Sequence, residues 1–259
     1  MTRTLESSIL LFHFFIFVLK TTEATGICSK CIQRGEKILN CPDTRNITIA
    51  YDEDFARNKM MPLAAAAYSD NPAPCVKGRK PFFENGSIYE YFYNAFHLLW
   101  IGGFEQGARD VLGQVTTEDY ELWITGLSLG GAIASVTSSY IAKLNLFPPS
   151  RTKLITFGQP RVADYDHAAW HDSTFPYSFR VINGRDPVPH IPPKIGPIAL
   201  FHHGTEIWYP TEMWPLSNYK VCREADGDYC SNSMLLWNIM DHVYYFEVDV
   251  GEYGKNGCQ

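Results

Sequence analysis

One serine in this chain has the neighbours that nucleophilic catalysis requires. Ser128 is the centre of the pentapeptide Gly126-Leu127-Ser128-Leu129-Gly130, which follows a strand-like run and precedes a helical run of small residues. In this strand–turn–helix context, the G-x-S-x-G motif exposes a serine hydroxyl on a tight turn. The two glycines leave room for strained dihedral angles and for close packing of the helix on the strand. The pentapeptide also occurs by chance in glycine-containing loops, but the flanking elements favour a nucleophile here.

A nucleophilic serine needs a base within hydrogen-bond reach, and that base needs a carboxylate to orient it. In hydrolases with this motif, the chain order is serine, then acid, then histidine. Asp186 directly follows a predicted strand at residues 179–183, and His242 lies in a late apolar segment. The order therefore predicts Ser128 as the nucleophile, Asp186 as the orienting acid and His242 as the base.

Chain order alone leaves other pairs open. His190 follows the predicted acid too closely to face it across the ends of the strands, whereas His202 and His203 satisfy the order. Asp241 adjoins the predicted base and is a second candidate for its carboxylate partner.

Composition indicates one folded α/β domain. The chain has 259 residues, of which 46% are hydrophobic and 19% are charged, so it can bury a core. The formal net charge of −6 does not match the basic surface of a nucleic-acid-binding protein. We therefore expect no nucleic-acid partner.

Residues 1–26 read as a signal peptide, which leaves residues 27–259 as the mature domain. Arg3 precedes an apolar core at residues 9–19, and residues 21–26 are small or polar. The apolar run is short for a membrane span, although an uncleaved anchor is the alternative. The sequence therefore predicts a secreted, extracellular protein with two glycosylation sequons, at Asn46 and Asn85.

Seven cysteines fit this oxidising location. Cys222 and Cys230 flank a short polar loop that a disulfide could close. The odd total leaves one thiol unpaired or paired with another chain. Cys28 and Cys31 have the spacing of half a zinc site, but no second ligand pair stands at zinc spacing.

The remaining pattern alternates strands and helices, which favours a parallel sheet. Strands are expected at residues 120–125, 153–157, 179–183 and 205–209. Helices are expected at residues 52–68, 88–112 with a break at 102–103, 131–144 and, as a closing helix or helix-turn, 233–246. Residues 81–87 read as a loop.

Several separate segments resemble the class 3 lipases, the fungal-type family, in the secreted form found in nematodes. They are residues 120–135, 156–161, 185–193, 201–209 and the pair Asp241-His242. The resemblance covers roughly residues 50–250. It implies an α/β-hydrolase fold, with a mostly parallel sheet and helices on both faces. It also implies the triad Ser128, Asp186 and His242, and a subgroup pattern that contains Cys222 and Cys230.

The chain departs from this family in two places. Leu127 stands where the family usually has histidine, which should change a pocket wall without removing the chemistry. Only residues 75–85 span the interval in which the family carries early strands and the segment with its second oxyanion donor. The sheet is therefore expected to be truncated in its early strands, with the Leu129 N–H left as the oxyanion donor and ester turnover weakened.

These observations predict a secreted lipase-like serine hydrolase that acts on triacylglycerol or related carboxylic esters. Its expected partners are a lipid or ester substrate and, transiently, a lipid surface; no metal or organic cofactor is required, and no oligomeric state follows. The alternative is a catalytically weak or silent lipase-like protein that binds lipid. A protease on the same fold is a weaker reading, because no segment resembles a peptide-specificity insertion.

Overall fold

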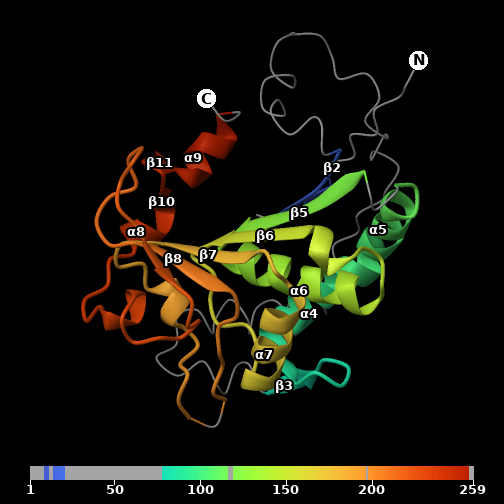
Figure 1. Ribbon diagram of the computed structural model, residues 1–259, viewed down its shortest axis with the longest axis horizontal. Helices are drawn as coiled ribbons and strands as arrows, with labels where there is room; N and C mark the ends of the chain where they lie inside the picture. The colour runs from blue at the N-terminus through green and yellow to red at the C-terminus, as the bar shows by residue number, and fades with distance from the viewer. Residues whose placement is uncertain (1–8, 12–13, 21–77, 116–118, 197, 257–259) are drawn as a thin grey trace, which may run out of the picture. The chain divides into compact units, whose positions relative to one another are not determined.

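The computed structural model describes residues 9–11, 14–20, 78–115, 119–196 and 198–256 (Figure 1). The expected helix at residues 52–68, the cysteines at positions 28, 31, 41 and 75, and the sequon at Asn46 lie outside these residues. From Arg79 onward the described elements belong to one compact unit, together with the N-terminal strands.

A seven-stranded sheet with the order β1-β2-β5-β6-β7-β8-β9 is the centre of this unit (Figure 1). Its four middle strands run parallel to one another, and β1, β2 and β9 add antiparallel edges. The expected α/β architecture with a mostly parallel sheet is confirmed. The strands are β1 (Ile9–Leu11), β2 (Phe14–Lys20), β5 (Tyr120–Leu127), β6 (Thr152–Phe157), β7 (Ser178–Asn183), β8 (Thr205–Tyr209) and β9 (Lys220–Cys222).

Two different layers cover the faces of the sheet. Alternate residues of β5, among them Leu122 and Ile124, are fully buried on the face that carries α6 (Leu129–Lys143), and α4 (Glu90–Leu99) packs on α6. On the other face, Tyr245 and Val250 pack with side chains of β6, β7 and β8. In Figure 1, α4 and α6 accordingly lie on one side of the sheet and α9 (Val250–Lys255) on the other.

The aromatic segment expected as a broken helix is broken where predicted. α4 continues into a wide turn at Trp100–Phe104, in which Gly103 adopts a φ of +117°, and α5 follows at Glu105–Leu112. Only glycine adopts such a positive φ without strain. The apolar stripe of these helices, including Phe92 and Phe96, is buried core, as expected for simple packing.

The closing helix predicted at residues 233–246 is wrong. This segment holds one 3-10 turn (Ser231–Ser233), a single turn of helix α8 (Met240–Val243), and the hairpin of β10 (Tyr244–Tyr245) and β11 (Val248–Asp249). Asn238 interrupts the helix, because its side-chain oxygen accepts the Met240 N–H at 3.2 Å. Asparagine competes with a helix in this way by bonding its own nearby backbone.

Several elements were not expected from the sequence. The predicted loop at residues 81–87 is the turn of a hairpin between β3 (Arg79–Pro81) and β4 (Ser87–Tyr89). Helix α7 (Tyr165–Thr174) begins at Asp164, whose side chain accepts the His167 N–H. The sequence of α7 has almost no apolar periodicity, because buried histidines take the core positions. The sequence also did not predict strand β9 or the short 3-10 turns Pro149–Arg151 and Val188–His190.

The N-terminal strands fall inside the expected signal peptide. β2 pairs antiparallel with β5 along seven residues, from Phe14 opposite Gly126 to Lys20 opposite Tyr120. The strand next to β5 on this side of the sheet is therefore β2, whereas residues 79–89 form a separate two-stranded sheet. The signal peptide stays a prediction, and cleavage after residue 26 would leave β5 as an edge strand. Among the described residues, no helix combines the length and the apolar character needed to cross a membrane.

Candidate active site

Ser128 occupies a strained turn between β5 and α6. Its φ of 58° and ψ of −126° are unusual for a residue with a side chain. The Ser128 N–H donates to the Phe157 carbonyl at 2.9 Å, which ties the turn to the end of the neighbouring strand β6. A Cβ atom at Gly126 would collide with the backbone of Gly130. The glycine spacing therefore serves the tight turn as the sequence predicted.

Asp186 and His242 form a hydrogen-bonded pair. His242 Nδ1 lies 2.8 Å from Asp186 Oδ2, and the Asp186 side chain is fully buried. The Tyr245 hydroxyl donates to the same carboxylate oxygen at 2.8 Å, and the Val188 N–H donates to the other at 2.9 Å. Burial and the Asp186 charge raise the pKa of Tyr245 well above its usual value, so this phenol remains a donor. Donation from Nδ1–H leaves His242 Nε2 available as a base.

Gly158 connects this pair to the serine turn. It follows Phe157 directly, has a φ of +53°, and its N–H donates to the Val181 carbonyl. A Cβ atom here would lie 2.7 Å from Asp186 Oδ2 and 2.8 Å from His242 Nδ1. Within the described part of the chain, the Ser128 hydroxyl has no hydrogen-bond partner. The structure therefore joins acid and base directly and brings the serine to the same corner through backbone contacts.

Asp241 serves the turn that carries the acid and does not orient its neighbour His242. Its Oδ2 accepts the Arg185 N–H at 2.7 Å, and the Asn183 side chain donates to the Tyr244 carbonyl at 2.8 Å. These bonds fasten the segment of the base to the turn of the acid.

The other candidate histidines have hydrogen-bond partners other than Asp186. His190 Nδ1 lies 3.0 Å from the Asn232 side-chain oxygen, and the ring stacks on Trp237. His202 is buried against the Pro189 carbonyl, and His203 Nε2 lies 2.6 Å from the Ser135 hydroxyl. Burial lowers the pKa of both His202 and His203 well below its usual range.

In the part of the chain that the structure describes, two groups of side chains have ligand-type atoms close enough together to be considered for a metal ion. His171, Asp172 and His203 form one group, but the two imidazoles stack face to face with centroids 3.6 Å apart. A metal binds an imidazole nitrogen in the plane of the ring, so this stack is not a coordination geometry. The other group contains Cys222 and Cys230, whose sulfurs are joined as a disulfide and are not thiolates.

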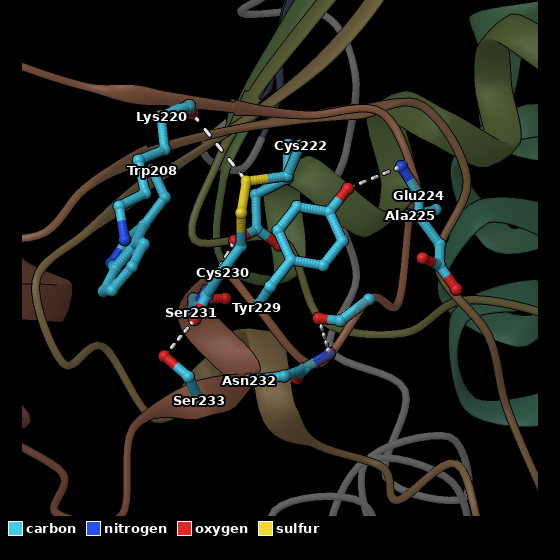
Figure 2. The surroundings of a disulfide bond; sticks show 12 residues. Trp208, Lys220, Cys222, Glu224, Ala225, Tyr229, Cys230, Ser231, Asn232 and Ser233 are labelled. Carbon is cyan, nitrogen blue, oxygen red and sulfur yellow. Dashed lines mark hydrogen bonds between the residues drawn. A yellow bond between two sulfur atoms is a disulfide. The ribbon is translucent and has the colours of Figure 1, made fainter.

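The disulfide between Cys222 and Cys230 closes the short polar loop, as the sequence suggested (Figure 2). Arg161 Nε donates to Asp226 Oδ1 in this loop at 2.8 Å, and the His202 N–H donates to Asp226 Oδ2 at 2.7 Å. The loop is therefore fixed on the strands near the acid turn by both covalent and charged contacts.

An apolar cavity of about 330 Å³ adjoins the serine turn. Its lining includes Leu127, Phe157, Tyr245 and Phe246. Leu127, which precedes Ser128, thus lines the wall of a cavity.

The Leu129 N–H is the donor that the sequence predicts for an oxyanion site. Leu129 begins α6, and the first N–H groups of a helix have no partner within the helix. The segment before α4 forms the β3–β4 hairpin, which is a sheet of its own and is not hydrogen bonded to β5.

Sequence reasoning missed Gly158 and Tyr245. Both are recognisable afterwards: Gly158 directly follows a predicted strand, and Tyr245 stands three residues after His242. Their roles depend on contacts across the chain, which spacing alone does not reveal.

Comparison with known proteins gives a consistent assignment. The family model described as lipase (class 3) matches residues 65–195, which include Ser128 and Asp186 and end before His242. A lipase of Caenorhabditis elegans, ZK262.3, is 32% identical over 212 residues, which are 71% of this chain and 59% of the relative. A secreted mono- and diacylglycerol lipase of Fusarium solani is 32% identical over 160 residues, 58% of this chain and 46% of its own.

A solved structure agrees with these relatives. It is described as a triacylglycerol lipase whose catalytic centre is a serine protease triad, and it superposes with a TM-score of 0.59 at 28% identity. The match covers 67% of this chain and 65% of the other. The chain thus spans less than two thirds of the length of both the nematode relative and this structure. From the match of the family model and the nematode relative, the chain belongs to the class 3 lipase family.

Proposed function

We propose that this protein hydrolyses carboxylic esters through Ser128, Asp186 and His242. The observation that carries the proposal is the corner at Phe157-Gly158, which contacts the strained serine turn on one side and the acid–base pair on the other. Membership of the class 3 lipase family supports the same reaction class.

In the proposed acylation step, each of these groups has one role. Ser128 Oγ attacks the ester carbonyl carbon while His242 Nε2 takes the hydroxyl proton, and the Asp186 carboxylate stabilises the resulting imidazolium. The Leu129 N–H donates to the oxygen that becomes negative. The alcohol then leaves with the proton from His242, and the acyl group stays on the serine. Water, deprotonated by His242, releases the carboxylic acid in the second half of the cycle.

Lipid esters are the proposed substrate class. A similar solved protein is described as a triacylglycerol lipase, and the apolar cavity beside Leu127 suits an aliphatic or aromatic group. Secretion is proposed from the N-terminal segment and from the secreted relative. N-terminal sequencing of the exported protein should begin near residue 27, and recovery of residues 9–20 would contradict cleavage.

Active-site labelling tests the nucleophile. The purified chain should react with a fluorophosphonate probe, and Ser128→Ala should abolish the reaction. Ser135→Ala is a matched control, because Ser135 also lies within hydrogen-bond distance of a histidine but is fully buried. Labelling that survives Ser128→Ala would refute the assignment.

A catalytically silent lipid-binding protein is the second candidate. The observation that favours it is the β3–β4 hairpin. Residues 79–89 form this hairpin and not a strand beside β5, so they do not supply a second oxyanion donor from that position. Losing one such donor costs about 100- to 1000-fold in rate. Fluorophosphonate labelling without measurable turnover of p-nitrophenyl esters would support this candidate, whereas turnover at rates typical of esterases would reject it.

A further inference from the structure

The turn of the β3–β4 hairpin holds an aromatic side chain in an unusual conformation. Phe83 has a φ of +49°, which a bulky residue rarely adopts, and 51% of its surface is exposed. Its neighbour Phe82 is fully buried, and the two rings meet edge to face with centroids 5.1 Å apart. Backbone strain of this kind persists where the position has a use, and core packing within the described residues already belongs to Phe82.

The hairpin is firmly attached to the helices beside it. Phe82 packs against Tyr140 on α6 and Trp170 on α7, with ring centroids 5.4 and 5.2 Å away. The Phe82 N–H donates to the Gly86 carbonyl at 2.9 Å, which closes the turn. Figure 1 shows the hairpin strand β3 next to α7, and β4 contacts this helix. The exposed Phe83 ring therefore stands on a fixed base.

The sequon Asn85-Gly86-Ser87 forms the other half of this turn. Ser87 Oγ donates to Asp164 Oδ2, and a Cβ atom at Gly86 would collide with Asp164, so both residues help to hold the turn against α7. The Asn85 side chain has no such role. Its oxygen is buried without a hydrogen-bond partner, whereas its nitrogen is neither hydrogen bonded nor sealed from solvent within the described part of the chain. That nitrogen is the atom to which an N-linked glycan is attached.

The positions of Phe83 and Asn85 suit a contact between an aromatic ring and a sugar. They are two positions apart in one turn, and both are partly exposed. The face of a pyranose is lined by C–H bonds with a slight positive charge, and the face of an aromatic ring is negative. A sugar on Asn85 can therefore cover Phe83 and remove its apolar surface from water.

We propose that Asn85 carries an N-linked glycan whose first N-acetylglucosamine packs on the Phe83 ring. The donor is an oligosaccharide joined to a polyprenyl pyrophosphate. A bond forms between Asn85 Nδ2 and C1 of the sugar, the bond from C1 to the pyrophosphate oxygen breaks, and the amide nitrogen gives up one proton as the pyrophosphate leaves. Transfer to the unfolded chain precedes the bond from Ser87 to Asp164. The proposal depends on the predicted secretion and is independent of ester hydrolysis.

The role of this glycan lies in the fold and not in the reaction. The Phe83 ring lies 5.7 Å from that of Tyr140, which stands twelve residues beyond Ser128 on α6. At 1.5 Å per residue, this separation is about 18 Å along the helix. Loss of the glycan should therefore lower thermal stability and leave ester hydrolysis within about twofold. Cover of Phe83 by residues 27–77 or by another protein is the competing explanation of its exposure.

The test uses the full chain secreted from yeast, with Asn46→Gln in every form so that Asn85 is the remaining N-x-S/T sequon. Endoglycosidase H trims the glycan to one N-acetylglucosamine, and Asn85→Gln supplies the bare form. Peptide mass measures the occupancy of Asn85, and circular dichroism measures the melting temperature. The one-sugar form should melt about 2–4 °C above the bare form. In a Phe83→Leu background this difference should fall below about 1 °C, whereas Phe83→Tyr, which keeps an aromatic face, should retain it.

Every outcome bears on the proposal. Secreted protein with an unmodified Asn85 overturns it, as does a chain that never enters the secretory pathway. An equal gain in melting temperature with Phe83 and with Phe83→Leu overturns the packing of the sugar on the ring. Phe83→Gly suits the positive φ and takes the place of Phe83→Leu if that variant does not fold. Ser128→Ala should be glycosylated like the wild type, so failure of the hydrolase function would leave this proposal standing.

Discussion

Ser128, the N-cap of helix α6, and Ser135, inside the helix, have very different surroundings. Ser128, at its start, is partly exposed and lies at the corner of the Asp186–His242 pair. Ser135, two turns later, lies 2.6 Å from His203, and both side chains are fully buried. The Ser135–His203 pair is within hydrogen-bond distance, but no carboxylate hydrogen bonds its imidazole within the described residues, and both side chains are sealed from solvent.

The difference shows that environment decides what a histidine can do. His242 is 14% exposed and hydrogen bonded to a carboxylate, which is the arrangement that the proposed base requires. His203 stacks on His171, which in turn stacks on Phe175, in the buried interior. Burial lowers the pKa of both His203 and His171 well below the usual range. The buried imidazoles therefore stay neutral and act as packing groups.

The largest expected effect is the difference in kcat between substitutions at the two carboxylates near His242, Asp186 and Asp241. Asp186→Asn should lower kcat by about 10⁴-fold, because the amide would favour the wrong tautomer of His242. Asp241→Asn is the matched control and should cost about tenfold or less, since Asp241 bonds the Arg185 N–H instead of the imidazole. Kinetics on p-nitrophenyl butyrate measure both. Equal losses would mean that Asp241 shares the orienting role.

Gly158 should be the next most sensitive position, because its lack of a side chain makes room for the contact between Asp186 and His242. A methyl group in Gly158→Ala would press on Asp186 Oδ2 and His242 Nδ1, at a φ that alanine avoids. We expect kcat to fall by about 100-fold through misplacement of the base. Gly254→Ala, where a Cβ meets no atom within 4 Å, should leave the rate unchanged. A normal rate in Gly158→Ala would show that the corner adjusts without disturbing the pair.

Ser135→Ala should have the opposite pattern to Ser128→Ala: it should lower the stability of the fold and leave the activity in place. It removes the shorter of two hydrogen-bond contacts of the buried His203 Nε2, which also lies 3.4 Å from Gln159 Nε2, so the free energy of unfolding should fall by about 1–3 kcal/mol while ester turnover persists. Urea denaturation measures the stability. Ser173→Ala, which removes only an exposed bond to the Trp170 carbonyl, should change stability by less than about 0.5 kcal/mol. Loss of turnover in stable Ser135→Ala protein would give the buried pair a catalytic role.

The smallest effect concerns pH. Burial lowers the pKa of His167 to about 4, and His171 and His203 also resist protonation in the folded state. The unfolded chain binds these protons below about pH 6.5, so stability is full above that pH and falls as the pH drops toward 4. Each such histidine adds about 1.4 kcal/mol per pH unit to this loss.

His171→Phe tests this prediction, because neither ring nitrogen of His171 has a hydrogen-bond partner and the ring only stacks. The slope of unfolding free energy between pH 6 and pH 4.5 should decrease by about one histidine's share. His97→Gln, at an exposed position, should not change the slope. An unaltered slope in His171→Phe would mean that the cluster is already protonated in the folded protein.

The sequence by itself predicted the strands around the serine turn and offered Asp186 and His242 among the candidates for acid and base. The apolar run of β5, the glycines around Ser128 and the position of Asp186 just after β7 are local signals, because strand formation and turn sterics act over a few residues. The same local reasoning failed at residues 233–246, where the Asn238 side chain bonds the Met240 N–H and interrupts the helix. The pairing of residues 14–20 with β5 also had no local signal, since an apolar run fits a strand and a signal peptide equally well.

Only the tertiary structure decided which carboxylate faces His242, which serine–histidine pair is sealed, and what Gly158 and Tyr245 contribute. Each of these depends on contacts between segments far apart in the chain: 56 residues separate the two members of the Asp186–His242 bond, and 68 separate Ser135 from His203. Burial, which sets the pKa of a histidine, is likewise a property of the whole packed chain and not of its neighbours in sequence. For that reason, residue type and order could propose the catalytic groups, and only the fold could tell a reactive histidine from a packing one.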